Sequence, residues 1–262
     1  MSSRGVGWVD GYFDYQIQKN SFVTCRGLNS LLYFFYKSPE VIRKLLEKKP
    51  IKILDAGAGD CMVARNIYSM RTSQDEFDPS ENKLYDTSVI APPIYWVENK
   101  MEKTSAVAEY PEDVIQQSCK VVENANNISA VSISYTVPEF ISDSNHKILK
   151  NRFFRDITNQ EIVGEGEGFD FIVDMIGIFA YSGTSYQKSR QEVISRYMEM
   201  LKPDGMLAMV CLLDMDAKKK IEADILKIRS GYRVLSRKDE TLVVCPLKDV
   251  FADSSDSVEV AE

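Results

Sequence analysis

A short run around residue 55 combines an acid with small residues in a spacing that suits ligand binding. Ile51 to Asp55 has the pattern of a buried strand that ends in a carboxylate, and Gly57 and Gly59 follow at alternate positions. Glycines let a ligand approach the backbone closely, and the helix predicted after this turn offers free N–H groups at its start. In an open α/β sheet such a turn lies at the carboxyl edge, where ligands bind.

The spacing separates this turn from the usual dinucleotide-binding loop. A G-x-G-x-x-G pattern would need glycine at position 62, which is Met62. The acid followed by alternating glycines, with Cys61 at the third position, instead resembles motif I of the class I S-adenosylmethionine-dependent methyltransferases. The alternative is a structural turn in another α/β domain. The resemblance implies that four residues of the turn bind S-adenosylmethionine: Asp55, Ala56, Gly57 and Gly59.

The next apolar segment, residues 94–99, is predicted to be a strand whose end carries Glu98 and Asn99. A carboxylate has two acceptor oxygens and no donor, so it can accept hydrogen bonds from both hydroxyls of a ribose. By the resemblance, Glu98 binds the ribose of the cofactor and its neighbour Asn99 is also a cofactor-binding residue; the alternative is a surface glutamate. A polar, turn-rich insertion at about residues 71–90 accounts for the long separation from the glycine turn.

A third acid, Asp156, ends the segment 152–156, which we predict to be the third core strand. A rival is the segment 131–137, where small polar and apolar residues alternate as in a half-buried strand. We expect this rival segment to belong instead to an insertion at about residues 127–147. The resemblance then implies that Asp156 binds the adenine amino group and that Ile157 packs on the adenine ring.

The run from Phe169 to Tyr181 begins with nearly continuous apolar residues, which is typical of a central parallel strand buried on both faces. It resembles the family's fourth strand, whose end faces the methyl group. The resemblance implies that Asp174 and Met175 line the methionine part of the cofactor. Asp174 and Tyr181 are also the candidates for a catalytic base, which assists methyl transfer to an oxygen or nitrogen acceptor.

The elements before the glycine turn are predicted to form an N-terminal helical cap, residues 1–50. Its abundant aromatic side chains suit a packed layer. Pro39 follows Ser38 as in the first turn of an amphipathic helix that covers the sheet. An alternative is that part of this segment closes over the ligand as a lid, with three candidate residues: Tyr12, Tyr15 and Arg26.

The elements after the fourth strand are predicted to complete the sheet. A helix ends at Leu201, and the Leu-Lys-Pro-Asp-Gly junction before the strand 206–213 again resembles the family. Two β-prone runs, 232–236 and 241–245, predict a terminal hairpin. We therefore expect one Rossmann-like, doubly wound α/β domain over residues 51–247, mostly parallel with an antiparallel C-terminal hairpin strand.

Charge and composition narrow the choice of partners. The net charge is −7, and the Ser-rich segment 248–262 holds one Lys and five acids, so this tail is predicted to be disordered and the body is only mildly acidic. Phosphate contacts need clustered Lys and Arg, so the composition disfavours nucleic acid. No apolar run is long enough to cross a bilayer, which predicts that the protein has no membrane partner.

Cysteine and histidine usage points away from metal and disulfide chemistry. The five cysteines are scattered and form no C-x-x-C pair, so we expect neither a zinc site nor a disulfide framework and place the protein in the cytoplasm. The only histidine, His146, lies in a polar turn region and is expected to face solvent. A lone histidine argues against a metal site and against a Ser-His-Asp triad.

Together these features predict an S-adenosylmethionine-dependent methyltransferase that acts on a small-molecule or protein acceptor. Three alternatives stay open. One is a catalytically inactive member of the same fold that binds or regulates, which Cys61 in place of glycine favours. Another is an aminopropyl-transferring enzyme, which would need further acids around the fourth strand besides Asp174. The third is a nicotinamide dehydrogenase, which Met62 disfavours.

Overall fold

The structure is a computed structural model. It describes the following residues: 12–16, 21–25, 28–35, 38–57, 63, 67, 112–134, 145–150, 154–175, 177–179, 189–210, 215–236 and 241–247. Within these residues, no helix is both long enough and apolar enough to cross a membrane.

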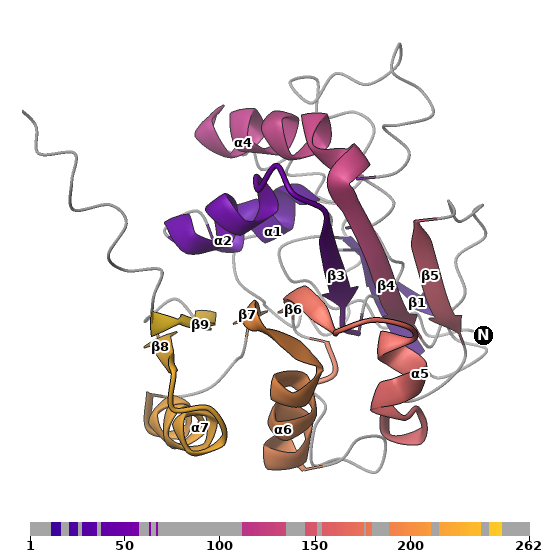
Figure 1. Ribbon diagram of the computed structural model, residues 1–262. Coiled ribbons are helices and arrows are strands. Elements are labelled where there is room, and N and C mark those ends of the chain that lie inside the picture. Colours follow the sequence, from indigo (N-terminus) through magenta and orange to yellow (C-terminus); the bar gives the residue numbers. More distant parts are fainter. Residues whose placement is uncertain are drawn as a thin grey trace, which may run out of the picture.

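One mixed sheet forms the centre of the molecule (Figure 1). Its seven strands lie in the order β5-β4-β3-β6-β7-β9-β8. Their bounds are β3 (Ile51–Asp55), β4 (Ile128–Ser134), β5 (His146–Lys150), β6 (Phe169–Met175), β7 (Leu201–Val210), β8 (Tyr232–Ser236) and β9 (Thr241–Pro246). The first five strands in this order pair in parallel, whereas β9 pairs antiparallel with both β7 and β8. This arrangement confirms the predicted Rossmann-like, doubly wound sheet and the terminal hairpin.

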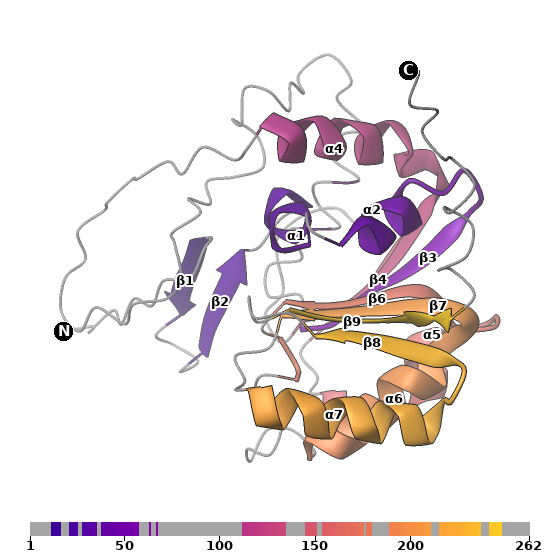
Figure 2. The ribbon, with the colours of Figure 1, turned by 90° about the vertical axis from the view of Figure 1, so that its left-hand side faces the viewer.

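Helices cover both faces of the sheet. Figure 2 shows α1 (Leu28–Phe34), α2 (Pro39–Leu45) and α4 (Glu112–Glu123) on one side and α6 (Arg190–Met200) and α7 (Met215–Ile228) on the other. A short helix, α5 (Asn159–Val163), packs through Ile162 into the same core cluster as α6 and α7. Two buried clusters result, one on each face, and the central strands contribute alternate residues to them.

The alternation along β3 and β6 fixes which side chains face which helices. Ile53 joins the cluster under α1, α2 and α4, whereas Leu54 joins the cluster under α6 and α7. On β6, Phe171 and Val173 face the first cluster and Ile172 faces the second. Every residue of β6 is buried, as its apolar pattern predicts for a central parallel strand. Asp55 therefore falls on the α1, α2 and α4 side and Asp174 on the α6 and α7 side.

The prediction that residues 152–156 form the third core strand is wrong. Residues Phe154–Asp156 form a 3-10 helix, η4, instead of the end of a strand. The alternating segment Ile128–Ser134 is the sheet strand β4, which pairs directly with β3, and β5 follows it. The expected insertion at 127–147 is therefore wrong where these two strands lie. The period-two pattern was the better guide, because it marks a strand with two different faces.

The N-terminal region, expected to be a helical cap, also contains strands. A two-stranded antiparallel hairpin, β1 (Tyr12–Gln16) and β2 (Ser21–Cys25), precedes α1 and α2. The lid roles of Tyr12 and Tyr15, which lie on β1, stay predictions, and Arg26 lies outside the described residues.

The junction between α6 and β7 is close to the expected one. Met200 is the last residue of α6, and Leu201 is both its C-cap and the first residue of β7. The expected strand 206–213 therefore begins earlier, and the pairing with β6 shifts register between Phe169 and Phe171. The Leu-Lys-Pro-Asp-Gly stretch lies in this irregular first part of β7.

Candidate functional site

The turns that leave β3 and β6 pack backbone against backbone. Gly57 has φ +68°, and a Cβ placed on it would lie 2.6 Å from the Cα of Gly177 and 2.6 Å from the nitrogen of Ile178. A Cβ on Gly177 would overlap the carbonyl oxygen of Ala56. The Ala56 N–H also donates to the carbonyl of Val173 at 2.8 Å. Both positions therefore require glycine, and we call this pair the glycine contact.

Asp174 holds the second of these turns in place. Its Oδ1 accepts the Gly177 N–H at 2.6 Å, and its Oδ2 accepts the Phe179 N–H at 2.8 Å and the Tyr197 hydroxyl at 2.7 Å. Asp174 is fully buried. Burial, together with the Asp174 charge, raises the pKa of Tyr197 well above its ordinary value, so this phenol stays a donor. The contacts give Asp174 a positioning role, while its cofactor and catalytic roles stay predictions.

Asp55 lies just before the glycine contact and is poorly satisfied. It is 4% exposed, and its Oδ2 has no hydrogen-bond partner among the described residues. Burial raises the pKa of Asp55 to about 7, with a further contribution from the Asp174 charge. A buried carboxyl without a partner is costly, and such groups mark functional sites more often than structural ones. A donor or cation from a ligand is the group that would satisfy it.

Two buried polar side chains continue from Asp55 across the sheet, and the local sequence did not mark either as a site residue. Ser132 on β4 is the register partner of Asp55, and its hydroxyl lies 2.8 Å from Nε2 of His146 on β5. Ser132 is fully buried and His146 is 3% exposed, so the expectation that His146 faces solvent is wrong. The reason is that β5 begins at His146 itself, directly after the polar turn. Asp55, Ser132 and His146 form a polar row across three adjacent strands.

Asp156 and Ile157 lie away from this row. Ile157 is buried in the cluster under α6 and α7, whereas the Asp156 side chain is 55% exposed and 3.4 Å from Arg155. Both residues line a surface cavity of about 480 Å³ against α6, to which Asp55 and Gly57 do not contribute. The structure therefore does not bring Asp156 and Asp55 into one described cavity. The adenine-binding roles of Asp156 and Ile157 stay predictions.

Arg196 on α6 explains the shape of the turn that carries these two residues. Its guanidinium donates to the carbonyls of Phe154 and Ile157 and to the Asn159 side chain, and it lies 3.8 Å from the centroid of the Phe154 ring. These contacts satisfy backbone carbonyls that a strand would have paired with a neighbouring strand. The local sequence could not reveal them, because Arg196 lies far along the chain.

Of the other expected site residues, the structure describes Met175 and leaves four undescribed. Met175 is buried at the end of β6, in the cluster under α1, α2 and α4. Four residues lie outside the described part of the chain, so their roles stay predictions: Gly59, Glu98, Asn99 and Tyr181. The sheet positions on both sides of β3 are occupied by β4 and β6. In the described residues, no group of three or more His, Cys, Asp or Glu side chains could hold a metal ion.

Among known proteins, solved structures resemble this chain, whereas family models and curated sequences do not. No family model matches the sequence, and no curated protein matches it. Among solved structures, the chain is similar to the 1,6-didemethyltoxoflavin-N1-methyltransferase of Burkholderia thailandensis, a complex with 1,6-didemethyltoxoflavin and S-adenosylhomocysteine. The identity is 11% and the TM-score 0.37, over 82% of this chain and 84% of that one.

Two other solved structures are similar over most of this chain. One is the CurJ carbon methyltransferase, with 9% identity and a TM-score of 0.40, over 83% of this chain and 54% of that one. The other is an O-methyltransferase family protein from Burkholderia thailandensis, with 9% identity and a TM-score of 0.35, over 83% of this chain and 57% of that one. The strand order and the antiparallel end of the sheet give this chain a Rossmann-like α/β fold. At these sequence identities and TM-scores, neither the methyl acceptor nor the site residues of these proteins can be assigned to this chain.

Proposed function

We propose that this protein binds S-adenosylmethionine at the carboxyl ends of β3 and β6 and transfers its methyl group to a small-molecule or protein acceptor in the cytoplasm. The observation that carries the proposal is the buried Asp55 next to the glycine contact, whose Oδ2 has no hydrogen-bond partner in the described part of the chain. The chain changes direction across the sheet between β3 and β6, because β3 is followed by β4 and β5 on one side and β6 continues on the other. Ligands of doubly wound sheets bind at such a switch point.

The described residues fit the polar end of this cofactor. The open Oδ2 of Asp55 is suited to an ammonium group, because a carboxylate accepts strong hydrogen bonds from a cation. Gly57 leaves the backbone without a side chain at the turn, and Asp174 fixes the neighbouring turn from Gly177 to Phe179. When bound, S-adenosylmethionine supplies an activated methyl group on a sulfonium. The contribution expected of the chain is to hold donor and acceptor in line and close together.

Binding of S-adenosylhomocysteine, measured by calorimetry, tests the proposal on the full chain. Asp55→Asn removes the charge but keeps the shape, and we expect it to weaken binding by about 10- to 100-fold, because a hydrogen bond to a charged group contributes about 1.5–3 kcal/mol. The matched control is Asp216→Asn on the exposed start of α7, with a side chain 96% exposed, which should leave the affinity unchanged. Equal affinities for the wild type and Asp55→Asn would remove Asp55 from the site, and no binding by the wild type would overturn the proposal.

A second function, binding without turnover, is favoured by the contacts of Asp174. Both of its oxygens already accept hydrogen bonds from Gly177, Phe179 and Tyr197, so it is poorly placed to take a proton from an acceptor. A regulatory protein of this fold would bind S-adenosylhomocysteine with the same dependence on Asp55. It would release no S-adenosylhomocysteine from S-adenosylmethionine with any acceptor tested, whereas an enzyme would. The release assay therefore separates the two functions.

A further inference from the structure

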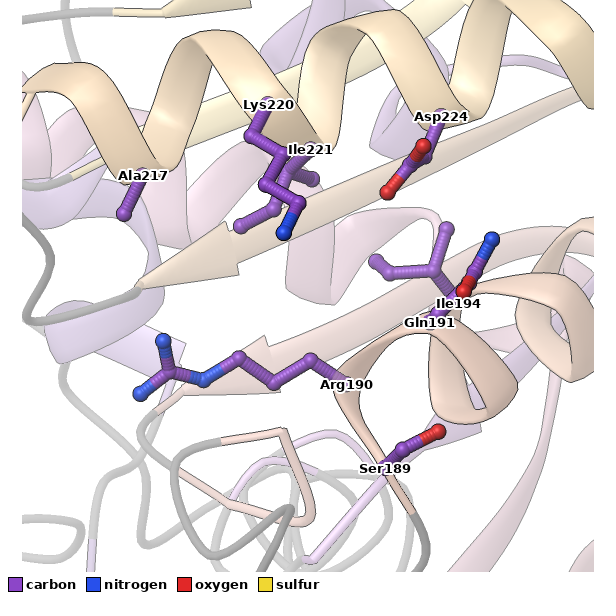
Figure 3. A pocket seen from close by; sticks show the side chains of 8 residues that line it. All are labelled: Ser189, Arg190, Gln191, Ile194, Ala217, Lys220, Ile221 and Asp224. Carbon is purple, nitrogen blue, oxygen red and sulfur yellow. The ribbon is translucent and has the colours of Figure 1, made fainter.

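A groove lies between α6 and α7 on the outer face of the molecule (Figure 3). Its volume is about 420 Å³, and Figure 3 shows Lys220 reaching from α7 toward α6. The residues that line it are Ser189, Arg190, Gln191, Ile194, Ala217, Lys220, Ile221 and Asp224. Ile194 and Ile221 are buried and give the groove an apolar floor. The proposed methyl-transfer chemistry uses none of these residues.

The groove carries positive charge that the described part of the chain leaves uncompensated. Arg190 and Lys220 are exposed, and neither makes an ion pair or a hydrogen bond with another described residue. Asp224, the acid at the groove, lies 3.5 Å from Lys227, which neutralises it. This cationic groove with an apolar floor belongs to a chain whose net charge is −7. The complementary ligand is an extended acidic segment with small apolar side chains.

We propose that the acidic segment 248–262 of this chain binds in the groove between α6 and α7. The segment follows Leu247, whose N–H donates to the carbonyl of Gly231 at 3.0 Å, so it starts just beyond the C-terminal end of α7. From there to Ile221 is roughly 15 Å along the helix, at about 1.5 Å per residue. An extended chain covers this distance with about five residues at about 3.3 Å each. Everything from about residue 253 onward is within reach of the groove.

The sequence of that part matches the groove in charge and in apolar character. Val258 and Val260 alternate with acids there, and suit a floor made by two isoleucines. The acids within reach are Asp253, Asp256, Glu259 and Glu262. Exposed ion pairs contribute little individually, so the apolar contacts and the covalent link must supply much of the binding. The link helps because a tethered segment is present at an effective concentration in the millimolar range.

Zero-length carbodiimide crosslinking of the full chain, read by mass spectrometry, tests this contact directly. The reagent joins a lysine amine to a carboxylate that touches it. We expect Lys220 to be linked to Asp253, Asp256 or Glu259 within one chain, and the yield to fall in about 0.5 M salt, where screening is strong. Lys219 is the internal control, because it is the neighbouring residue on the same helix, is 70% exposed and does not line the groove.

Three crosslinking outcomes would overturn the proposal. Equal tail yields at Lys219 and Lys220 would mean random encounters, and no tail link at Lys220 would mean an empty groove. The third is a link found only between copies, which a mixture of isotope-labelled and unlabelled protein reveals, and which would place the tail of a second copy there.

Charge reversal gives an independent readout. Cleavage of the full chain after Glu259 by a glutamate-specific protease should be slow in the wild type and in Lys219→Glu. It should become several-fold faster in Lys220→Glu, because the reversed charge repels the acidic segment. Both substitutions are at exposed positions of α7, and circular dichroism checks that each variant keeps its fold. Equal cleavage rates for the two variants would also overturn the proposal, whatever the outcome of the cofactor-binding test.

Discussion

Gly57 and Gly177 touch through their backbones at the carboxyl ends of β3 and β6, so closely that neither can carry a side chain. Gly57 is also held at a positive φ, which other residues adopt only with strain. The contact explains how the chain can bring its two central strand ends so close together. It also makes a sharp stability test possible.

Gly57→Ala should destabilise the protein by about 1–3 kcal/mol, because a methyl group there forces backbone shifts. The measurement is urea-induced unfolding, followed by circular dichroism. Gly231→Ala is the matched control, since a Cβ there would meet nothing within 4 Å. We expect this control to change stability by less than about 0.5 kcal/mol. If both variants cost the same, the close contact is not what requires glycine at position 57.

Removing one hydrogen bond from the Asp174 carboxylate should cost less than removing its charge. Tyr197→Phe deletes the phenol that donates at 2.7 Å, and we expect a loss of about 1–2 kcal/mol. Asp174→Asn also weakens the bonds from Gly177 and Phe179, so the loss should reach about 2–4 kcal/mol. Denaturant unfolding of both variants and of the double variant measures their coupling. Strictly additive losses would show that the two side chains act independently.

The stability of the protein should depend on the protonation of Asp55. Its pKa is raised from 3.8 to about 7 by burial, so the folded state holds this proton more tightly than the unfolded state does. The contribution to stability is present below the unfolded pKa and is lost as pH rises toward 7, with a slope of up to about 1.4 kcal/mol per pH unit.

Asp55→Asn imitates the protonated acid and should remove this part of the pH dependence. Urea unfolding at several pH values between about 4 and 8 compares the two proteins, and the difference between their curves isolates Asp55 from the other carboxyl groups. We expect the variant to gain stability relative to the wild type as pH increases. Parallel curves over the whole range would contradict the raised pKa.

Arg196→Lys should destabilise the turn that carries Asp156. A lysine cannot reproduce the planar fork that serves the carbonyls of Phe154 and Ile157 together with the Asn159 side chain. Leaving these groups unpaired should cost about 1–3 kcal/mol in unfolding experiments. Arg190→Lys on the same helix is the matched control, because Arg190 is exposed and no described residue pairs with it. A loss as small as that of the control would mean that solvent satisfies the turn.

The parts that sequence predicted well are those whose signal is local. The apolar run of β6 and the two β-prone runs of the terminal hairpin are each visible within a few residues. Asp55 and Gly57 likewise predict a turn at the edge of the sheet from a few neighbouring residues. Period-two alternation correctly marked Ile128–Ser134 as a strand pattern, and the error lay in preferring an acid as evidence for a strand end.

The parts that were missed depend on partners far apart in the sequence. The segment around Phe154 looks like a strand because it ends in an acid, yet the carbonyls of Phe154 and Ile157 accept hydrogen bonds from Arg196. The polar residues around His146 suggest exposure. In the fold, however, His146 is buried, and its ring hydrogen-bonds with the hydroxyl of Ser132 on the neighbouring strand. The hydrogen bond between Asp174 and Tyr197 is equally invisible before the fold is known.

Tyr197 has a wider consequence, because α6 carries both this residue and the groove residues Arg190 and Ile194. A small displacement of α6 would change the Tyr197–Asp174 hydrogen bond, and with it the anchoring of the turn that presses on Gly57. One helix thus carries residues of both the outer surface and the interior edge of the sheet.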